Sequence, residues 1–315
     1  MLDIWLEHID TISDTEVGYE LISHFITLNG DAVYLHKKES KPDTLETIGQ
    51  QYKVLRHTKG QVEETFLPPL KMMTHLDPII DFFSDGSLLI ADRRCQYRGV
   101  DDYDLNGMIY NPKTKEIRQF LAGDGIEQAQ IDHNDNIWIS YFDEGTIGNY
   151  GWGNVNARPL ADPIGKTGLN CFDSLGNIIW KFDQADAFID DCYAMNVTPQ
   201  DTHIYYYSDF DFCTISENYQ TSFFSPKLGG CETFAISGKY LLFDGQYEGD
   251  ICKAYLIKKA GESFNSPIPV NLKLSHGEAF SEGTLIGRGN KLHLFTKTDW
   301  FAIDAREAFE QADAV

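Results

Sequence analysis

The feature that most constrains the fold is a hairpin pattern that recurs along the chain. A short apolar stretch runs into a turn of Gly, Asn or Asp, and a second apolar stretch follows. These turn residues tolerate the positive φ of tight hairpins, and the flanking Ile, Val, Phe, Tyr and Trp suit pleated strands. The pattern recurs at intervals of about 50 residues, with turns at Asn29-Gly30, Asp85-Gly86, Asp135-Asn136, Gln200-Asp201, Ser237-Gly238 and Gly289-Asn290.

Evenly spaced hairpins are typical of a radial β-repeat, because one hairpin cannot bury a core alone and stacked neighbours can. Many flanking runs, such as Leu88–Ala91, are apolar at every residue, which suits strands buried on both faces. The sequence therefore predicts one all-β domain over residues 1–315, a single six-bladed β-propeller with four-stranded blades. Trp138 is expected between blades, the N-terminal segment LDIWLEHI is expected to complete the last blade, and Asp304 is expected to cap a short helix over about 304–313.

Charge narrows the classes of partner. The chain carries 26 Lys and Arg against 48 Asp and Glu, a net charge of −22. Such a charge repels nucleic acid and anionic membranes, and it favours a basic protein partner or simply confers solubility. No apolar run is long enough to span a membrane, and the acidic N-terminus lacks the features of a secretory signal. We therefore expect a cytoplasmic protein that binds neither nucleic acid directly nor membrane.

Motifs for catalysis and for cofactors are absent from the sequence. It contains no G-x-S-x-G elbow, no H-E-x-x-H, no phosphate-binding loop and no dinucleotide fingerprint. Its six cysteines show neither C-x-x-C nor zinc spacing, which predicts buried free thiols. We therefore expect no catalytic residue, no cofactor and no bound metal. His75 and His276 lie beside acidic residues discussed next and are interpreted as loop residues, although a role as base or ligand stays open.

The propeller prediction places many acidic side chains at one end of the ring. The innermost strand of a blade begins at the same end at which the second strand finishes, because the two form a hairpin. A carboxylate lies near the start of each expected inner strand, at the channel mouth: Glu20, Asp77, Glu127, Asp191, Glu232 and Glu278. Further acids follow the second strands: Asp92, Asp101, Asp102, Asp104, Asp143, Glu144, Asp209, Asp211, Asp244, Glu248, Asp250 and Asp299.

Three interpretations of this acidic end remain open. Converging carboxylates can hold a divalent cation, as in metal-dependent lactonase propellers, which would make the chain a hydrolase. An acidic face can instead dock a basic protein, with opposed fields that speed association. The third interpretation is an ordinary polar, water-filled propeller channel. Arg93, Arg94 and Arg98 lie on the same side and would neutralise part of the charge.

The longest irregular segment, Asp143–Gly168, is rich in Gly, Asn and Pro and contains Tyr150 and Trp152. Long loops in compact domains are often functional, and large aromatic side chains are frequent anchors of interfaces. Trp152 packed back onto its own blade is the structural alternative. The residues predicted to contact a basic partner are Asp143, Glu144, Tyr150, Trp152, Asp209, Asp211, Asp244 and Glu248.

Two segments carry a resemblance to a known family. IDHNDNIWISYFDEGTIGNYGWGN (131–154) and PIGKTGLNCFDSLGNIIWKF (163–182) resemble a family of uncharacterised bacterial propeller proteins. That family has a D-x-x-x-x-I-W-[IV]-x-Y-F-D-E-G core, a loop rich in Gly and Asn, and a G-L-x-x-F-D-x-x-G-x-x-x-W strand pair. The match covers about 50 residues, and a tryptophan-containing strand is a packing motif that does not define an activity.

An acidic propeller without a leader also resembles the immunity proteins of contact-dependent growth inhibition toxins, which neutralise basic nuclease domains. This resemblance rests on overall type and charge, and no motif carries it. It implies a protein without catalysis of its own that covers the active site or the RNA-binding surface of a cognate nuclease toxin.

Overall fold

The computed structural model describes residues 1–12, 17–39, 49–58, 60–71, 76–154, 161–184, 187–245, 250–261, 263–275, 277 and 280–314. Strands make up most of its regular structure. The chain divides into two compact units: unit 1 is Met1–Thr15 with Tyr193–Val315, and unit 2 is Glu16–Cys192. Each unit is described by itself.

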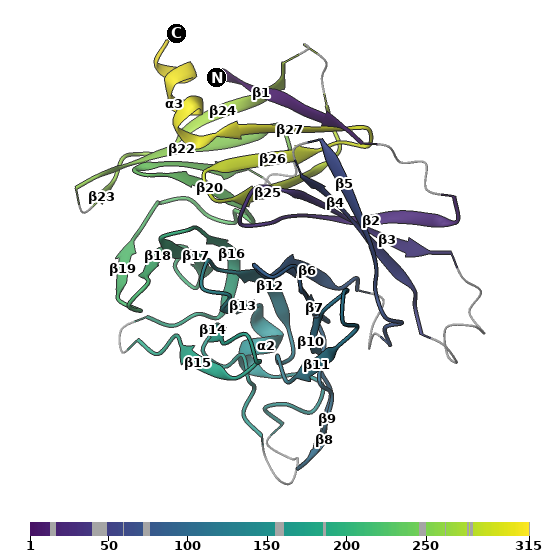
Figure 1. Cartoon of the computed structure of the whole chain (residues 1–315). Coiled ribbons are helices and arrows are strands. Elements are labelled where there is room, and N and C mark those ends of the chain that lie inside the picture. The colour runs from purple at the N-terminus through teal and green to yellow at the C-terminus, as the bar shows by residue number, and fades with distance from the viewer. Residues whose placement is uncertain are drawn as a thin grey trace. The chain divides into compact units, whose positions relative to one another are not determined.

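Unit 2 contains three antiparallel four-stranded sheets, each built by neighbouring segments of the chain (Figure 1). The first consists of β2 (Tyr19–Ile26), β3 (Ala32–Lys38), β4 (Tyr52–Thr58) and β5 (Gln61–Phe66). The second consists of β6 (Ile79–Phe82), β7 (Leu88–Ala91), β10 (Gly107–Tyr110) and β11 (Ile117–Phe120), with the small pair β8 (Tyr97–Gly99) and β9 (Asp102–Tyr103) inserted. The third consists of β12 (Ile126–Ile131), β13 (Ile137–Tyr141), β14 (Leu169–Phe172) and β15 (Ile178–Lys181), and helix α2 (Asp143–Ile147) follows β13.

A further four-stranded sheet begins at the boundary of unit 2 and runs through unit 1. It consists of β16 (Asp191–Val197), β17 (Asp201–Tyr207), β18 (Asp211–Ser216) and β19 (Thr221–Phe224). A nine-stranded sheet completes unit 1. Its strands are β20 (Phe234–Ser237), β21 (Tyr240–Asp244), β22 (Lys253–Ala260), β23 (Ser263–Phe264), β24 (Ile268–Leu274), β25 (Thr284–Arg288), β26 (Lys291–Phe295), β27 (Asp299–Asp304) and β1 (Leu2–Thr11).

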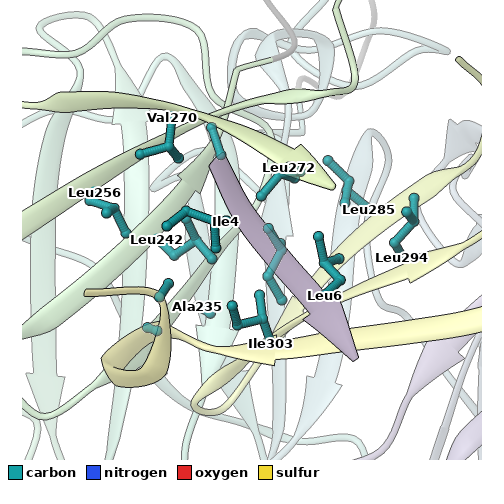
Figure 2. Close-up of a cluster of buried hydrophobic side chains, with 14 of the residues drawn as sticks. Ile4, Leu6, Ala235, Leu242, Leu256, Val270, Leu272, Leu285, Leu294 and Ile303 are labelled. Atoms are coloured by element: carbon teal, nitrogen blue, oxygen red, sulfur yellow. The ribbon is translucent and has the colours of Figure 1, made fainter. Parts of the chain in front are cut away.

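Strand β1 joins the four strands β20, β21, β22 and β24 to the three strands β25, β26 and β27 within the nine-stranded sheet. It pairs antiparallel with β27, the pairing predicted for the N-terminal segment, and parallel with β24. Figure 1 shows β1 in purple between these two strands. Successive side chains of β1 point to opposite faces of the sheet, so that Ile4 and Leu6 are fully buried on one face while Asp3 and Trp5 are exposed on the other. Figure 2 shows the two buried side chains in a cluster with Leu242, Leu272 and Ile303.

The predicted turns fall between paired strands. Gly30, Gly86, Asp135, Gly238 and Gly289 all have positive φ, between 58° and 86°, which is why Gly and Asp occupy these positions. The turn predicted at Gln200-Asp201 lies one residue earlier, because Asp201 already begins β17. At the C-terminus, α3 (Ala305–Asp313) begins after Asp304, whose carboxylate accepts a hydrogen bond from Arg306 N.

The predicted core residues are found inside the units. Trp138 in β13 is 4% exposed, so its burial is confirmed, and its indole N–H donates to Asp132 Oδ2 at 3.0 Å. All six cysteines are free thiols, and five of them are buried. Among the described residues, no helix is both long enough and apolar enough to cross a lipid bilayer.

Candidate functional site

The ends of three chain segments meet around Arg94 in unit 2. Arg94 follows β7, Asp124 precedes β12, and Glu144 lies in α2 after β13. The Arg94 guanidinium donates from Nη2 to Asp124 Oδ2 at 3.0 Å and pairs through Nη1 with Glu144 Oε2 at 2.7 Å. Residues after a second strand and before an inner strand thus meet here, as the hairpin argument from the sequence predicts. We call these three residues the Arg94 network.

Two glycines allow these segments to approach. Gly125 has φ +69°, and a Cβ on either Gly125 or Gly145 would collide with the backbone of the other segment. A Cβ on Gly145 would lie 2.5 Å from the Asp124 carbonyl oxygen. The approach is closed by a hydrogen bond from Phe142 N to Gly125 O at 2.9 Å. The sequence Gly123-Asp124-Gly125 is therefore what brings Asp124 beside α2.

The guanidinium of Arg94 is buried between aromatic rings. Its side chain is 4% exposed, and its Cζ lies 4.4 Å from the ring centre of Tyr150 and 5.3 Å from that of Phe142. Asp124 is equally buried, with 1% of its side chain exposed, whereas the Glu144 side chain is 48% exposed. The Arg94 network therefore links an interior ion pair to a carboxylate at the surface. A buried guanidinium with two carboxylates is fixed in position by charge and by cation–π contacts together.

The environment moves the pKa values of these acids in opposite directions. Burial raises the pKa of Asp124 to about 6, and the nearby Glu144 adds to this, although the Cys95 N–H and Arg94 act against it. The pKa of Glu144 is lowered, because Asn149 and Arg94 donate hydrogen bonds to its carboxylate. Asp124 is thus the strained member of the network and Glu144 the stably ionised one.

A second acidic group lies next to this network, and we call Asp143, Glu144, Asp190 and Asp191 the acidic cluster. The Thr146 hydroxyl bridges Asp143 O at 2.9 Å and Asp190 O at 2.6 Å, which brings the two segments together. Burial raises the pKa of Asp191 to about 6, and the charges of Asp143 and Asp190 raise it further. Asp143 and Glu144 are exposed. Like charges are therefore crowded at an accessible surface.

The other predicted channel-mouth carboxylates have separate environments. Asp77 pairs with Lys37 at 3.3 Å, Glu127 is part-buried in β12 where its carbonyl oxygen accepts from Arg93 Nη1, and Glu20 and Glu232 are exposed. Glu278, Glu248, His75 and His276 lie outside the described residues. In the part of the chain that the structure describes, no three His, Cys, Asp or Glu side chains are placed to hold one metal ion.

Two predicted partner-binding residues are inaccessible, so the exposure predicted for them is wrong. Trp152 is 4% exposed, and its indole N–H donates to Cys95 O at 2.9 Å. It packs against Cys95 and Tyr97 of the segment between β7 and β10, which is neither a free surface nor its own sheet. Asp244 is fully buried, and its Oδ1 accepts from Glu232 N at 2.9 Å and Thr233 N at 3.2 Å. The sequence around Trp152, rich in Gly and Asn, does not reveal its contact with a distant segment.

The remaining predicted contact residues differ in accessibility. Tyr150 is half-buried against Arg94, Asp209 is exposed, and Asp211 is partly buried. Burial raises the pKa of Asp211, and the neighbouring charge of Asp209 adds to this. Asp124 was absent from the predicted set, although an aspartate between two glycines just before an apolar strand is a recognisable sign of a tight loop with a buried acid.

Comparisons with known proteins leave the chain without a family. No protein-family model and no curated protein matches it. Among solved structures, one described as "YCF48 bound to D1 peptide" superposes with a TM-score of 0.45 at 8% identity, and the match covers 96% of this chain and 91% of that one. A TM-score this low supports no inference about the fold or the ligands of this chain.

Proposed function

We propose that the chain is a six-bladed β-propeller whose acidic end binds a basic protein. The strand pairings support the blade count, because the sheets resolve into six antiparallel groups of four strands. These groups are β2–β5, β6-β7-β10-β11, β12–β15, β16–β19, β20-β21-β22-β24 and β25-β26-β27-β1. The last group takes its outer strand from the N-terminus, an arrangement that closes many propellers.

The proposed activity is capture and neutralisation of a basic partner, in the first place a cognate nuclease toxin, so that the chain acts as a non-catalytic immunity protein in the cytoplasm. The observation that carries this proposal is the acidic cluster. Burial raises the pKa of Asp191, the charges of Asp143 and Asp190 raise it further, and a partner's Lys or Arg side chain placed there would relieve that repulsion. The net charge of −22 adds a long-range attraction for the same class of partner.

Association kinetics test this proposal. The full chain and a candidate basic nuclease toxin domain are mixed at increasing salt, and the association and dissociation rates are measured. Salt screens opposed fields beyond about 8–10 Å, so association is expected to slow while dissociation changes less. Asp143→Asn is expected to slow association about threefold, and the exposed Glu63→Gln in β5, which removes the same charge, is expected to have a smaller effect. Equal effects of the two variants, or no binding, would contradict the proposal.

A further inference from the structure

Unit 2 also contains a cavity that the acidic cluster does not explain. It has a volume of about 560 Å³, which suits a ligand the size of a small organic molecule. One wall comes from the segment after β5 and includes Pro69, Leu70 and Lys71. The opposite wall comes from the segment after β7 and from the start of β10.

The lining combines an apolar surface with charged groups. Asp92, Arg94, Gln96 and Arg98, at every second position of the segment after β7, all line the cavity. The apolar part is formed by Pro69, Leu70, Ile90, Leu105 and Met108. A cavity with one apolar surface and a few polar groups orients a ligand that has the same two parts.

The hydrogen bonds within the lining show which polar groups are left to bind a ligand. Asp104 accepts from Arg98 Nη2 at 2.8 Å and from Gln96 N at 3.0 Å, and Asp92 accepts from Arg94 N at 3.1 Å. The lining carboxylates are therefore already engaged by donors. Among the described residues, in contrast, Lys71 is exposed and its ammonium has no ion pair. The unused capacity of the cavity is thus mainly for donating hydrogen bonds.

We propose that this cavity binds an organic anion with an apolar body, such as a carboxylate, sulfonate or phosphate on a hydrophobic framework. The anionic group accepts from Lys71, and the body packs on Leu70, Leu105 and Met108. The charges of Arg94 and Arg98 are offset by Asp102, Asp104, Asp124 and Glu144, so the attraction for the anion rests on Lys71. This site goes beyond the proposed function. The anion site requires the cationic Lys71, whereas binding of a basic partner requires carboxylates. An experiment can therefore reject one proposal without rejecting the other.

Fluorescence titration of the full chain with 1-anilinonaphthalene-8-sulfonate tests the site. We expect one molecule of this dye to bind each chain saturably. N-phenyl-1-naphthylamine, which lacks the sulfonate, is expected to bind at least tenfold more weakly. Lys71→Met, which keeps an unbranched stem, is expected to weaken sulfonate binding about tenfold and to leave the neutral dye unaffected. Lys113→Met, at an exposed lysine between β10 and β11 of the same sheet, is expected to change neither.

A second variant tests whether the dyes bind in this cavity or at an unrelated site. Leu105→Ala shortens an exposed part of the apolar wall and is expected to weaken both dyes by a similar factor. The proposal is overturned if sulfonate binding survives Lys71→Met, if neither variant differs from Lys113→Met, or if a trimethylammonium dye of similar size binds more tightly than the sulfonate.

Discussion

Asp124 in unit 2 and Asp244 in unit 1 are both buried aspartates next to strand ends, yet their surroundings use the carboxylate differently. Asp124 faces Arg94, whose guanidinium continues to the exposed Glu144. Asp244 accepts two backbone N–H groups of the segment before β20. The first arrangement connects the interior to a charged surface, whereas the second fixes a loop. Of these two buried strand-end acids, Asp124 is the one that a buried cation links to an exposed carboxylate.

The largest expected effect concerns the packing beneath the Arg94 network. Trp152→Ala removes a buried indole that contacts Tyr97 and donates to Cys95 O, so we expect a loss of about 4 kcal/mol in the free energy of unfolding. Urea denaturation measures it, with Trp5→Ala as control, because Trp5 is 44% exposed. Equal stability of the two variants would show that Trp152 is not a packing residue.

The next effect tests the buried ion pair itself. Arg94→Met leaves Asp124 buried without its cation, so we expect a loss of about 3 kcal/mol at pH 7. The loss should shrink at pH 5, because the pKa of Asp124, already raised to about 6, rises further and the group is protonated there. Arg98→Met removes the pairs of an exposed guanidinium with Asp102 and Asp104, and should lower the stability much less than Arg94→Met does at pH 7, with little change at pH 5. A loss for Arg94→Met that does not depend on pH would show that the charge of Asp124 does not cause it. The contrast drawn between Asp124 and Asp244 would then have no electrostatic basis.

The two regions also show what the sequence could predict. Turn residues and apolar runs predict the strand pairs, because hairpins are local and their chemistry is written in neighbouring residues. The hairpin argument also places Asp143, Glu144 and Asp191 at related strand ends, and in the structure the charge of Asp143 acts on Asp191 whereas Glu144 pairs with Arg94. It cannot predict that Trp152 reaches Cys95, because the two lie on segments whose distance the local pattern does not fix. The β20–β21 hairpin does bring Asp244 opposite Thr233, but the pattern does not show that the carboxylate turns inward to the N–H groups of Glu232 and Thr233.

A smaller effect is expected at Asp244, whose carboxylate accepts two backbone N–H groups. Asp244→Ala removes the acceptor of the Glu232 and Thr233 N–H groups, and we expect a loss of about 2 kcal/mol in the free energy of unfolding. Asp244→Asn keeps an oxygen acceptor and should recover about half of it. Thermal and urea denaturation check both variants. If Asp244→Asn instead weakened binding of a basic partner without loss of stability, the inward-facing role of Asp244 would be wrong.

The smallest expected effect distinguishes the acidic cluster from the rest of the acidic surface. The folded pKa of Asp191 is about 6, above its ordinary value of 3.8, so the folded state binds this proton more tightly than the unfolded chain does. The resulting penalty is complete above about pH 6 and disappears as the pH falls toward 4. Asp191→Asn should therefore stabilise the protein by about 1 kcal/mol at pH 7, after discounting for solvent screening, and by almost nothing at pH 4.

Self-repulsion of the whole chain also eases as the pH approaches the pI of about 4.6, so a matched charge removal is needed. Glu63→Gln removes one exposed charge outside the cluster, and it should stabilise the protein less than Asp191→Asn at pH 7. Equal gains would mean that the raised pKa reflects net charge alone. A bound basic partner should remove the advantage of Asp191→Asn, because its cations take over the relief that the substitution provides. If the advantage persisted in the complex, the partner would be docked away from the acidic cluster.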